Sequence, residues 1–284
     1  MDWIIPVSWS ETASDMLGPA TANAAYAALR EHGCAILRGV FSSSEGEVLH
    51  REYQSQYGAM DIHQMQEQSA KPPPSQFIEV GEARYDITVR MKGAFAAPRL
   101  LANTLLRRFL TPLLGDNMRL NSFTVVVSHP GAQLQHPHRD HGHLYPELPP
   151  DPPLPPHAIN VAIPLIDVGI DTGPTGIWLG SHKWPESYIP PPEAMTTVPF
   201  QRGDCILVDY RTLHTGLPNR SAVVRPIIYM TYARPWFFDE CNHLGRSSLN
   251  MTLETYQALP ESVRPLLLRA HLQAMRTRLL SETP

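Results

Sequence analysis

The order of apolar and polar positions gives the opening of the chain two helix signals around one strand signal. In residues 20–32, apolar side chains recur at the spacing of one helix face, and the apolar run at 34–40 has the length of a buried strand. Serines at 42–44 then offer N-caps for a helix that extends to about residue 57. We therefore expect these helices to buttress a sheet.

The next part of the chain mixes loop, strand and helix signals. Residues 64–76 are polar and contain three consecutive prolines, which predicts a loop. Residues 84–90 alternate apolar with polar side chains, a pattern typical of a half-buried strand. Leucines recur at helical spacing in 99–114, with Gly115 as the expected stop.

Short apolar runs separated by Gly and Pro dominate the middle of the chain and predict a double-sheet jelly roll. The expected strands are 123–127, 158–166, 176–179, 197–200, 205–209 and 227–232, and helical signals return at 253–259 and 265–280. The prediction is a mainly β fold with flanking helices around a double-stranded β-helix (jelly-roll, cupin-like) core. It divides a single domain, 1–284, into a helical buttress (1–117), the core (about 118–235) and C-terminal helices (236–284).

Composition narrows the possible environments and partners. The chain is 43% hydrophobic, its formal net charge is -4 with a pI near 6.3, and like charges form no block, so we expect neither nucleic-acid nor membrane binding. Cys34, Cys205 and Cys241 lack disulfide or metal spacing, which favours a reducing compartment. Since the N-terminus lacks a signal-peptide pattern and no apolar run approaches ~20 residues, we expect a cytoplasmic protein.

The candidate chemistry begins at the segment Gln-His-Pro-His-Arg-Asp, residues 135–140. His138 and Asp140 stand two apart after an apolar run, so on an extended segment both project from the same face. His214, which follows the predicted strand 205–209, is our candidate for a third ligand. Two histidines and one carboxylate form the facial arrangement of non-haem Fe(II) oxygenases, which leaves positions free for cosubstrate and dioxygen.

Arg225 completes this constellation eleven residues after His214. Iron can chelate the keto acid end of 2-oxoglutarate while a guanidinium forks onto the far carboxylate, a geometry that Lys cannot reproduce. The combination therefore predicts an Fe(II)- and 2-oxoglutarate-dependent oxygenase.

These motifs resemble those of the phytanoyl-CoA dioxygenase-like family of Fe(II)/2-oxoglutarate oxygenases, in particular its fungal-type branch that tailors natural products. The matching segments are QHPHRD (135–140), GPTGIWLGSHKW (173–184), GDCILVDYRTLHTG (203–216) and NRSAVVR (219–225). The resemblance implies iron ligation by His138, Asp140 and His214. It also implies cosubstrate contacts from Gln135, Thr175 and Arg225, with dioxygen as the oxidant.

Two departures from the family pattern lie away from the ligands. The family often has Asn where this chain has Thr172, and Pro where it has Leu179. Other histidines, His136, His141 and His143, crowd the same stretch, so a different set that binds zinc remains an alternative.

Substrate identity depends on less specific signals. Side chains near the metal in sequence or at strand ends are expected to wall the pocket, and their aromatic character suits an apolar small molecule. The candidates are Tyr85, Met91, Phe95, Tyr145, Trp236 and Phe238. The proline-rich segment 145–156 is either a stiff surface connection or one wall of this pocket.

Three other functions stay open at this point. The chain could hydroxylate an acyl-CoA or another primary metabolite, although no Lys/Arg cluster for CoA phosphates is visible. It could instead be a metal-dependent isomerase or hydrolase on a cupin-like barrel that does not use 2-oxoglutarate. A non-catalytic partner of an active homologue is disfavoured by the intact ligand set. A homodimer built from the C-terminal helices is a further expectation.

Overall fold

The computed structural model describes residues 1–73, 75–149, 152 and 154–282. Its strands are β1 (Ile4–Pro6), β2 (Cys34–Arg38), β3 (Phe77–Gly81), β4 (Arg84–Thr88), β5 (Arg119–Ser128), β6 (Ala158–Pro164), β7 (Thr175–Ile177), β8 (Cys205–Asp209), β9 (His214–Gly216) and β10 (Arg225–Ala233). Its α-helices are α1 (Trp9–Ser14), α2 (Pro19–His32), α3 (Ser43–Tyr57), α4 (Ile62–Ser69), α5 (Pro98–Leu101), α6 (Thr104–Leu114), α7 (Leu253–Ala258) and α8 (Leu268–Glu282).

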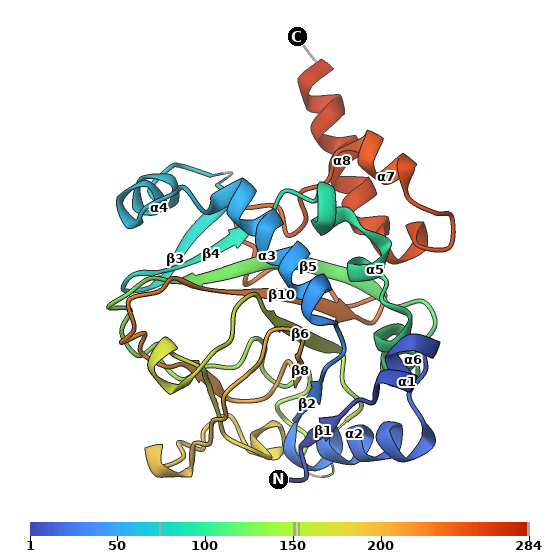
Figure 1. Cartoon of the computed structure of the whole chain (residues 1–284), viewed down its shortest axis with the longest axis vertical. Coiled ribbons are helices and arrows are strands. Elements are labelled where there is room, and N and C mark those ends of the chain that lie inside the picture. Colours follow the sequence, from blue (N-terminus) through green and yellow to red (C-terminus); the bar gives the residue numbers. More distant parts are fainter. Residues whose placement is uncertain (74, 150–151, 153, 283–284) are drawn as a thin grey trace.

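An eight-stranded sheet in the order β1-β2-β8-β6-β10-β5-β4-β3 runs through the centre of the molecule (Figure 1). Apart from the parallel pair β1 and β2, its neighbouring strands are antiparallel. Strands β7 and β9 form a second, two-stranded antiparallel sheet. The fold is therefore the expected jelly-roll core with flanking helices, in which a short second sheet accompanies a large one.

The two faces of the large sheet differ in chemistry because side chains alternate along each strand. On β5, Phe123 and Val125 are fully buried and point to the face that we call the helix face. Ser122 points to the opposite face, the site face, where its Oγ donates to Thr231 Oγ1 of β10 at 2.9 Å. The apolar core lies on the helix face, while polar side chains gather on the site face.

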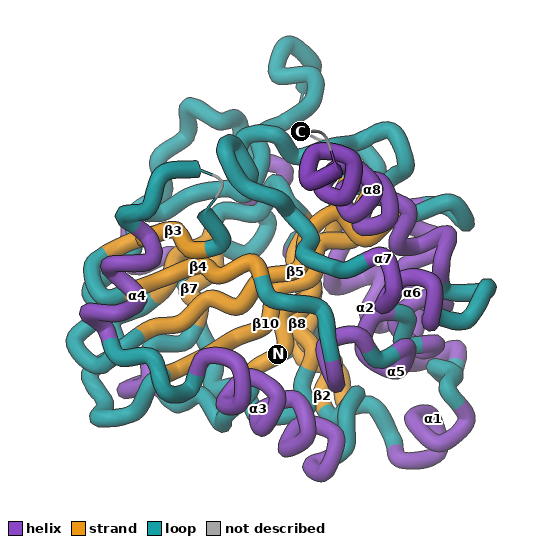
Figure 2. Tube along the Cα trace, turned by 90° about the horizontal axis from the view of Figure 1, so that it is seen from above, coloured by secondary structure: helices purple, strands orange, loops and turns teal. Residues whose placement is uncertain are grey.

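Helix α2 packs on β1, β2 and β8, as the sequence predicted for the opening of the chain. It ends at Gly33, whose φ of 71° favours glycine. A Cβ at this position would lie 2.4 Å from Thr212 Oγ1 and 2.5 Å from His182 Nδ1, so no larger residue fits. Figure 2 shows α2, α5 and α6 together beside one end of the strands, while α3 and α4 lie elsewhere around them.

Several local predictions were wrong for identifiable reasons. The predicted loop at 64–76 begins inside α4, which a capping box between Asp61 and Gln64 starts and a buried Met65 anchors. The helix expected at 99–114 is split in two because the Asn103 side chain accepts a hydrogen bond from the Leu106 amide at 3.0 Å and starts α6.

The remaining differences concern short strands. Residues 197–200 form no strand, and within them only Phe200 makes an isolated bridge, to Val168. Strands β1 and β3, at the two edges of the large sheet, had no clear sequence signal. Strand β4 was predicted, but its polar positions are largely buried on the site face and not exposed to solvent.

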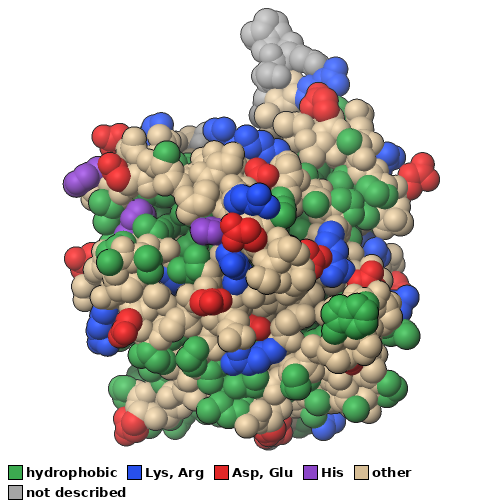
Figure 3. Space-filling view, viewed as in Figure 1, with side chains coloured by type: hydrophobic (Ala, Val, Ile, Leu, Met, Phe, Trp, Pro, Cys, Tyr) green, Lys and Arg blue, Asp and Glu red, His purple; other side chains and the backbone are tan. Residues whose placement is uncertain are grey.

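The molecular surface carries acidic and basic side chains interspersed with apolar ones on the face that Figure 3 shows. Helices α7 and α8 project from the body at the C-terminal end of the chain (Figure 1). Among the described residues, no helix has the length and apolar character needed to cross a bilayer.

Candidate metal centre

The structure brings His138, Asp140 and His214 together. Their ligand atoms all lie within 4.8 Å of one another, and His214 Nε2 is 3.7 Å from Asp140 Oδ1. The main chains of His138 and His214 exchange two hydrogen bonds of 2.9 Å, which joins the loop after β5 to the start of β9. A backbone bridge therefore holds the two imidazoles at a fixed separation.

Hydrogen bonds orient each ligand. Nδ1 of His138 lies 3.0 Å from the carbonyl oxygen of His136, and Nδ1 of His214 lies 3.0 Å from that of Thr212. Because a carbonyl can only accept, Nδ1 must carry the proton in both rings, and the lone pair for a metal is on Nε2. Asp140 Oδ2 accepts from Asn160 Nδ2 at 3.1 Å, so Oδ1 is the oxygen beside His214.

Electrostatics keep these donors ready to bind a cation. Burial, followed by the nearby His214, lowers the pKa of His138 to about 4. The imidazole is therefore neutral at neutral pH, as a metal ligand must be. The donor set of two imidazole nitrogens and one carboxyl oxygen fits a divalent iron with three positions left open.

Buried histidines also predict how stability depends on pH. Burial lowers the pKa of His157 to about 4, and its side chain packs against Phe237 and Tyr210. Between pH 6.5 and 4 the unfolded chain binds a proton that the folded chain does not. The free energy of unfolding of the metal-free protein should therefore fall on acidification, by up to about 1.4 kcal/mol per pH unit for each such histidine.

Denaturant unfolding of the metal-free protein between pH 7 and 4.5 measures this dependence. His157→Leu removes one titrating group that is not a metal ligand. The free energy of unfolding of this variant should therefore change less with pH than that of wild type. An equally steep profile in His157→Leu would contradict the assignment.

A row of buried polar side chains crosses the site face beside the metal ligands. Arg225 of β10 pairs with Ser128 of β5, and Ser128 pairs with Arg84 of β4, so the three side chains share one face. Arg225 Nε and Nη2, Ser128 Oγ and Arg84 Nε are buried without a hydrogen-bond partner. Unpaired buried polar atoms are costly, each by about 1–3 kcal/mol, so their convergence indicates a site for an anion.

Arg84 is the residue that our sequence reasoning missed. It is 1% exposed, and its guanidinium donates to the carbonyl oxygens of Gln133 at 3.2 Å and Leu217 at 2.9 Å. Burial and the neighbouring Arg225 lower the pKa of Arg84 to about 10, so Arg84 remains charged at neutral pH. Burial also lowers the pKa of Arg225. The alternation at residues 84–90 was the available signal, since it sends Arg84 and Tyr85 to opposite faces of the sheet.

Gln135 and Thr175 lie next to this row. The main chains of both residues pair with Gly216, which lies two residues after His214. The main-chain N–H of Gln135 donates to the Gly216 carbonyl at 3.0 Å, and Thr175 pairs with Gly216 in the small sheet. A Cβ at Gly216 would lie 2.6 Å from Arg84 Nη1 and 3.0 Å from Gln135 Oε1. Gln135, Thr175 and Arg84 therefore meet at Gly216, two residues after His214.

Three of the predicted pocket residues lie elsewhere. Tyr85 pairs with Val127 and so points to the helix face, away from Arg84. Phe95 packs edge to face on Phe123 with ring centroids 5.5 Å apart, and Met91 belongs to the same buried core. Side-chain alternation along β4 places Tyr85 on this face, whereas Met91 and Phe95 follow the strand and pack into the same core.

The other pocket candidates lie on the surface. Tyr145 is 52% exposed, Trp236 packs its ring on Phe237, and Phe238 lies under the Arg269 guanidinium. A role in substrate binding stays a prediction for these three.

The proline-rich segment 145–156 contains Pro150, Asp151 and Pro153, which lie outside the described residues. Its end, at Leu154, Pro155 and Pro156, borders a surface cavity of about 700 Å³. Ile159 and Asp209 also line this cavity and point to the helix face, so it is separate from the metal ligands.

The alternative histidines do not assemble a second centre. Across 1–73, 75–149, 152 and 154–282, His138, Asp140 and His214 are the one group of three ligands close enough to share an ion. His141 instead packs on His157 and Phe237, and His143 Nε2 lies 3.1 Å from the Trp184 carbonyl oxygen.

Comparisons with curated proteins find fungal dioxygenases. The iron/alpha-ketoglutarate-dependent dioxygenase ausU of Aspergillus calidoustus is 33% identical over 88 residues, 31% of this chain and 29% of ausU. Dioxygenase andF of Emericella variicolor is 30% identical over 122 residues, 42% of this chain and 41% of andF. Multifunctional dioxygenase ausE of Emericella nidulans is 25% identical over 209 residues, 69% of this chain and 68% of ausE. The matches to ausU and andF thus span less than half the length of those relatives.

Solved structures support the fold. The non-heme alpha ketoglutarate dependent epimerase SnoN from nogalamycin biosynthesis superposes with a TM-score of 0.59 at 18% identity, over 76% of this chain and 82% of SnoN. AviO1 from Streptomyces viridochromogenes superposes with a TM-score of 0.54 at 21% identity, over 78% of this chain and 98% of AviO1.

A family model described as phytanoyl-CoA dioxygenase (PhyH) matches residues 29–227. This range begins in α2 and ends in β10, so it contains the three metal ligands and both buried arginines. The ligand geometry and the match over most of the chain agree: the chain belongs to the phytanoyl-CoA dioxygenase (PhyH) family.

Proposed function

We propose that this protein is a non-haem Fe(II)- and 2-oxoglutarate-dependent dioxygenase that oxidises a C–H bond of an apolar small molecule in natural-product biosynthesis. Hydroxylation, desaturation and related oxidations all fall within this proposal. One observation carries it: two buried arginines with unpaired donors lie beside a ligand triad that leaves metal positions open. A metal-dependent hydrolase would need the open positions but has no use for the arginines.

The proposal gives each group of residues a separate role. His138, Asp140 and His214 would hold the iron, which together with 2-oxoglutarate and dioxygen supplies the C–H oxidation and releases succinate and carbon dioxide. Arg225 and Arg84 bind the far carboxylate of 2-oxoglutarate and fix its direction. Because both guanidiniums are almost fully buried, little water competes for that carboxylate, which strengthens the electrostatic attraction.

The comparisons support the class of reaction and substrate. The fungal relatives carry dioxygenase names, two of the solved structures are those of an alpha ketoglutarate dependent enzyme from nogalamycin biosynthesis, and one of these two contains Fe3+ and alpha ketoglutarate. The formal net charge of -4 offers no attraction for the phosphates of an acyl-CoA. We therefore favour an uncharged, largely apolar substrate over an acyl-CoA.

Anaerobic titration of the purified apoprotein with Fe(II) and then 2-oxoglutarate tests the proposal. We expect a weak visible metal-to-ligand charge-transfer band that requires both additions, because the keto acid must chelate the iron. Succinate release on admitting dioxygen should then depend on Fe(II). Metal binding with no such band at saturating 2-oxoglutarate would contradict the proposal and favour an isomerase or hydrolase.

A further inference from the structure

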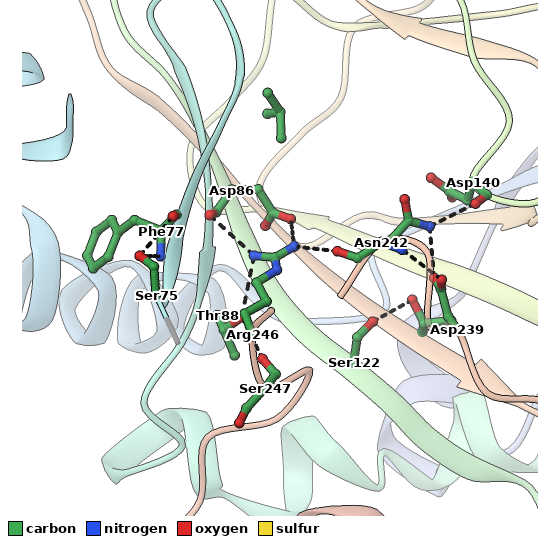
Figure 4. Close-up of polar contacts among 12 residues, drawn as sticks. Ser75, Phe77, Asp86, Thr88, Ser122, Asp140, Asp239, Asn242, Arg246 and Ser247 are labelled. Atoms are coloured by element: carbon green, nitrogen blue, oxygen red, sulfur yellow. Dashed lines mark hydrogen bonds and ion pairs between the residues drawn. The ribbon is translucent and has the colours of Figure 1, made fainter. Parts of the chain in front are cut away.

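The segment between β10 and α7 crosses the site face and ends against β4. We call residues 236–250 the strap. Its far end is held by Thr88, whose Oγ1 donates to the Ser247 carbonyl at 3.0 Å, and by an ion pair between Arg246 and Asp86. Figure 4 shows Arg246 and Asp86 at one end of a line of polar contacts and Asp140 at the other. The strap therefore reaches from a metal ligand to the strand that carries Arg84.

Asn242 makes the strap's contact with the metal ligand. Its Nδ2 donates to the Asp140 carbonyl oxygen at 2.8 Å and to Asp239 Oδ2 at 2.8 Å. Asp239 is 1% exposed. Its carboxylate also accepts from the main-chain N–H of Asn242 at 3.0 Å and from the Tyr210 hydroxyl at 2.8 Å. Each oxygen of this buried carboxylate therefore has a partner.

The contacts close into a ring that begins and ends at Asp140. From Tyr210 the path runs to Thr231 Oγ1 at 3.3 Å, then to Asn160 Oδ1 at 3.5 Å. Because Tyr210 donates its proton to Asp239, the single Thr231 proton serves one of these two contacts at a time. Asn160 Nδ2 completes it by donating to Asp140 Oδ2 at 3.1 Å. The ring thus holds one ligand at two points, the backbone carbonyl through Asn242 and the carboxylate through Asn160.

The ring determines which oxygen Asp140 offers to a metal. With Oδ2 engaged by Asn160, Oδ1 is the oxygen that faces His214. One-oxygen ligation keeps an additional coordination position free, and the proposed chemistry needs that position for the cosubstrate or dioxygen. A fully paired buried network is rigid, whereas a network that loses one member leaves costly unpaired groups.

We propose that Asn242, Asp239 and Tyr210 are positioning residues that hold Asp140 as a one-oxygen metal ligand. This inference rests on the proposed metal site but assigns a task to residues that touch neither metal nor cosubstrate. Among the described residues, the hydrogen bonds of the buried Asp239 carboxylate all lead to Asn242 or Tyr210, which points to a role in holding Asn242.

Equilibrium binding of Co(II) to the apoprotein, followed by its visible d–d bands, tests the inference without a substrate. Asn242→Ala and Tyr210→Phe should each weaken Co(II) binding by about 10- to 100-fold, the usual cost of losing a group that orients a ligand. Both variants should also change the d–d spectrum, because the main chain of Asp140 is then held less firmly through Asn242 and its carboxylate can shift relative to the two histidines.

Matched controls separate positioning from general damage to the fold. Tyr232→Phe removes a buried hydroxyl that donates to the Leu101 carbonyl on the helix face, and Asn250→Ala removes an amide from the strap that does not contact Asp140. We expect thermal unfolding of Tyr232→Phe to resemble that of Tyr210→Phe, while both controls keep the wild-type Co(II) affinity and spectrum.

Each outcome decides between the hypotheses. Wild-type affinity and spectrum in Asn242→Ala and Tyr210→Phe would overturn the positioning role and leave the proposed function standing. Equal weakening in Tyr232→Phe would also overturn it, because the effect would then follow from stability. A wild-type protein that binds no Co(II) would overturn the metal site itself and with it both proposals.

Discussion

Replacing His138 with Ala is expected to abolish Fe(II)-dependent succinate release and the anaerobic charge-transfer band. Fe(II) affinity should fall by more than it does when a residue that only supports a ligand is removed, which costs about 10- to 100-fold. The reason is that one of three protein donors disappears. The measurements are equilibrium Fe(II) binding, the band at saturating 2-oxoglutarate, and succinate release in air. His214→Ala should behave in the same way, since its Nε2 lies beside Asp140 in the same cluster.

His143→Ala is the matched control for these variants. His143 comes from the same histidine-rich stretch, but its Nε2 contacts the Trp184 carbonyl oxygen and takes no part in the cluster. Wild-type iron binding is expected in His143→Ala. If His143→Ala lost iron while His138→Ala retained it, the ligand assignment would be wrong.

Removing either buried arginine is expected to weaken 2-oxoglutarate binding strongly. Loss of one partner from a buried, hydrogen-bonded charge pair costs about 2–4 kcal/mol, which corresponds to a rise in Kd of about 30- to 1,000-fold. We expect this effect for both Arg225→Ala and Arg84→Ala, because both guanidiniums line the same row with Ser128. Titration of the charge-transfer band with 2-oxoglutarate gives the Kd directly.

Arg225→Lys tests geometry apart from charge. Lys keeps the positive charge but cannot fork onto a carboxylate, so its Kd should lie between those of wild type and Arg225→Ala. Iron affinity in the absence of 2-oxoglutarate should be unchanged in all three arginine variants. An Arg84→Ala variant with wild-type Kd would remove Arg84 from the site and leave Arg225 as the anchor.

The sequence predicted the cluster of His138, Asp140 and His214 because its signal is local. His138 and Asp140 share one short segment, and the strand before His214 is a clear apolar run. The jelly-roll core was predictable for the same reason, since its strands are apolar and separated by Gly and Pro. Arg225 followed from its spacing to His214 and the start of another apolar run.

The contacts between distant segments could not be predicted in this way. Arg84 reaches the site only through strand pairing across β5, and no motif marks it. Tyr85 was assigned to the pocket because it is aromatic and lies in a strand, but register decides its face. Asn242 and Asp140 touch across a sequence separation of 102 residues, so no local pattern relates them.

The position of the strap late in the chain bears on how the protein is made. During synthesis all three metal ligands and both arginines leave the ribosome before Asp239, Asn242 and Arg246 do. Domains form from the N-terminus as the chain emerges, so a nascent chain that ends after β10 would hold every ligand while Asp140 still lacked its support from Asn242. On the proposed positioning role, the centre therefore reaches its final form only when residues 236–250 fold back across β4 and β5, and we expect tight metal binding only after that step.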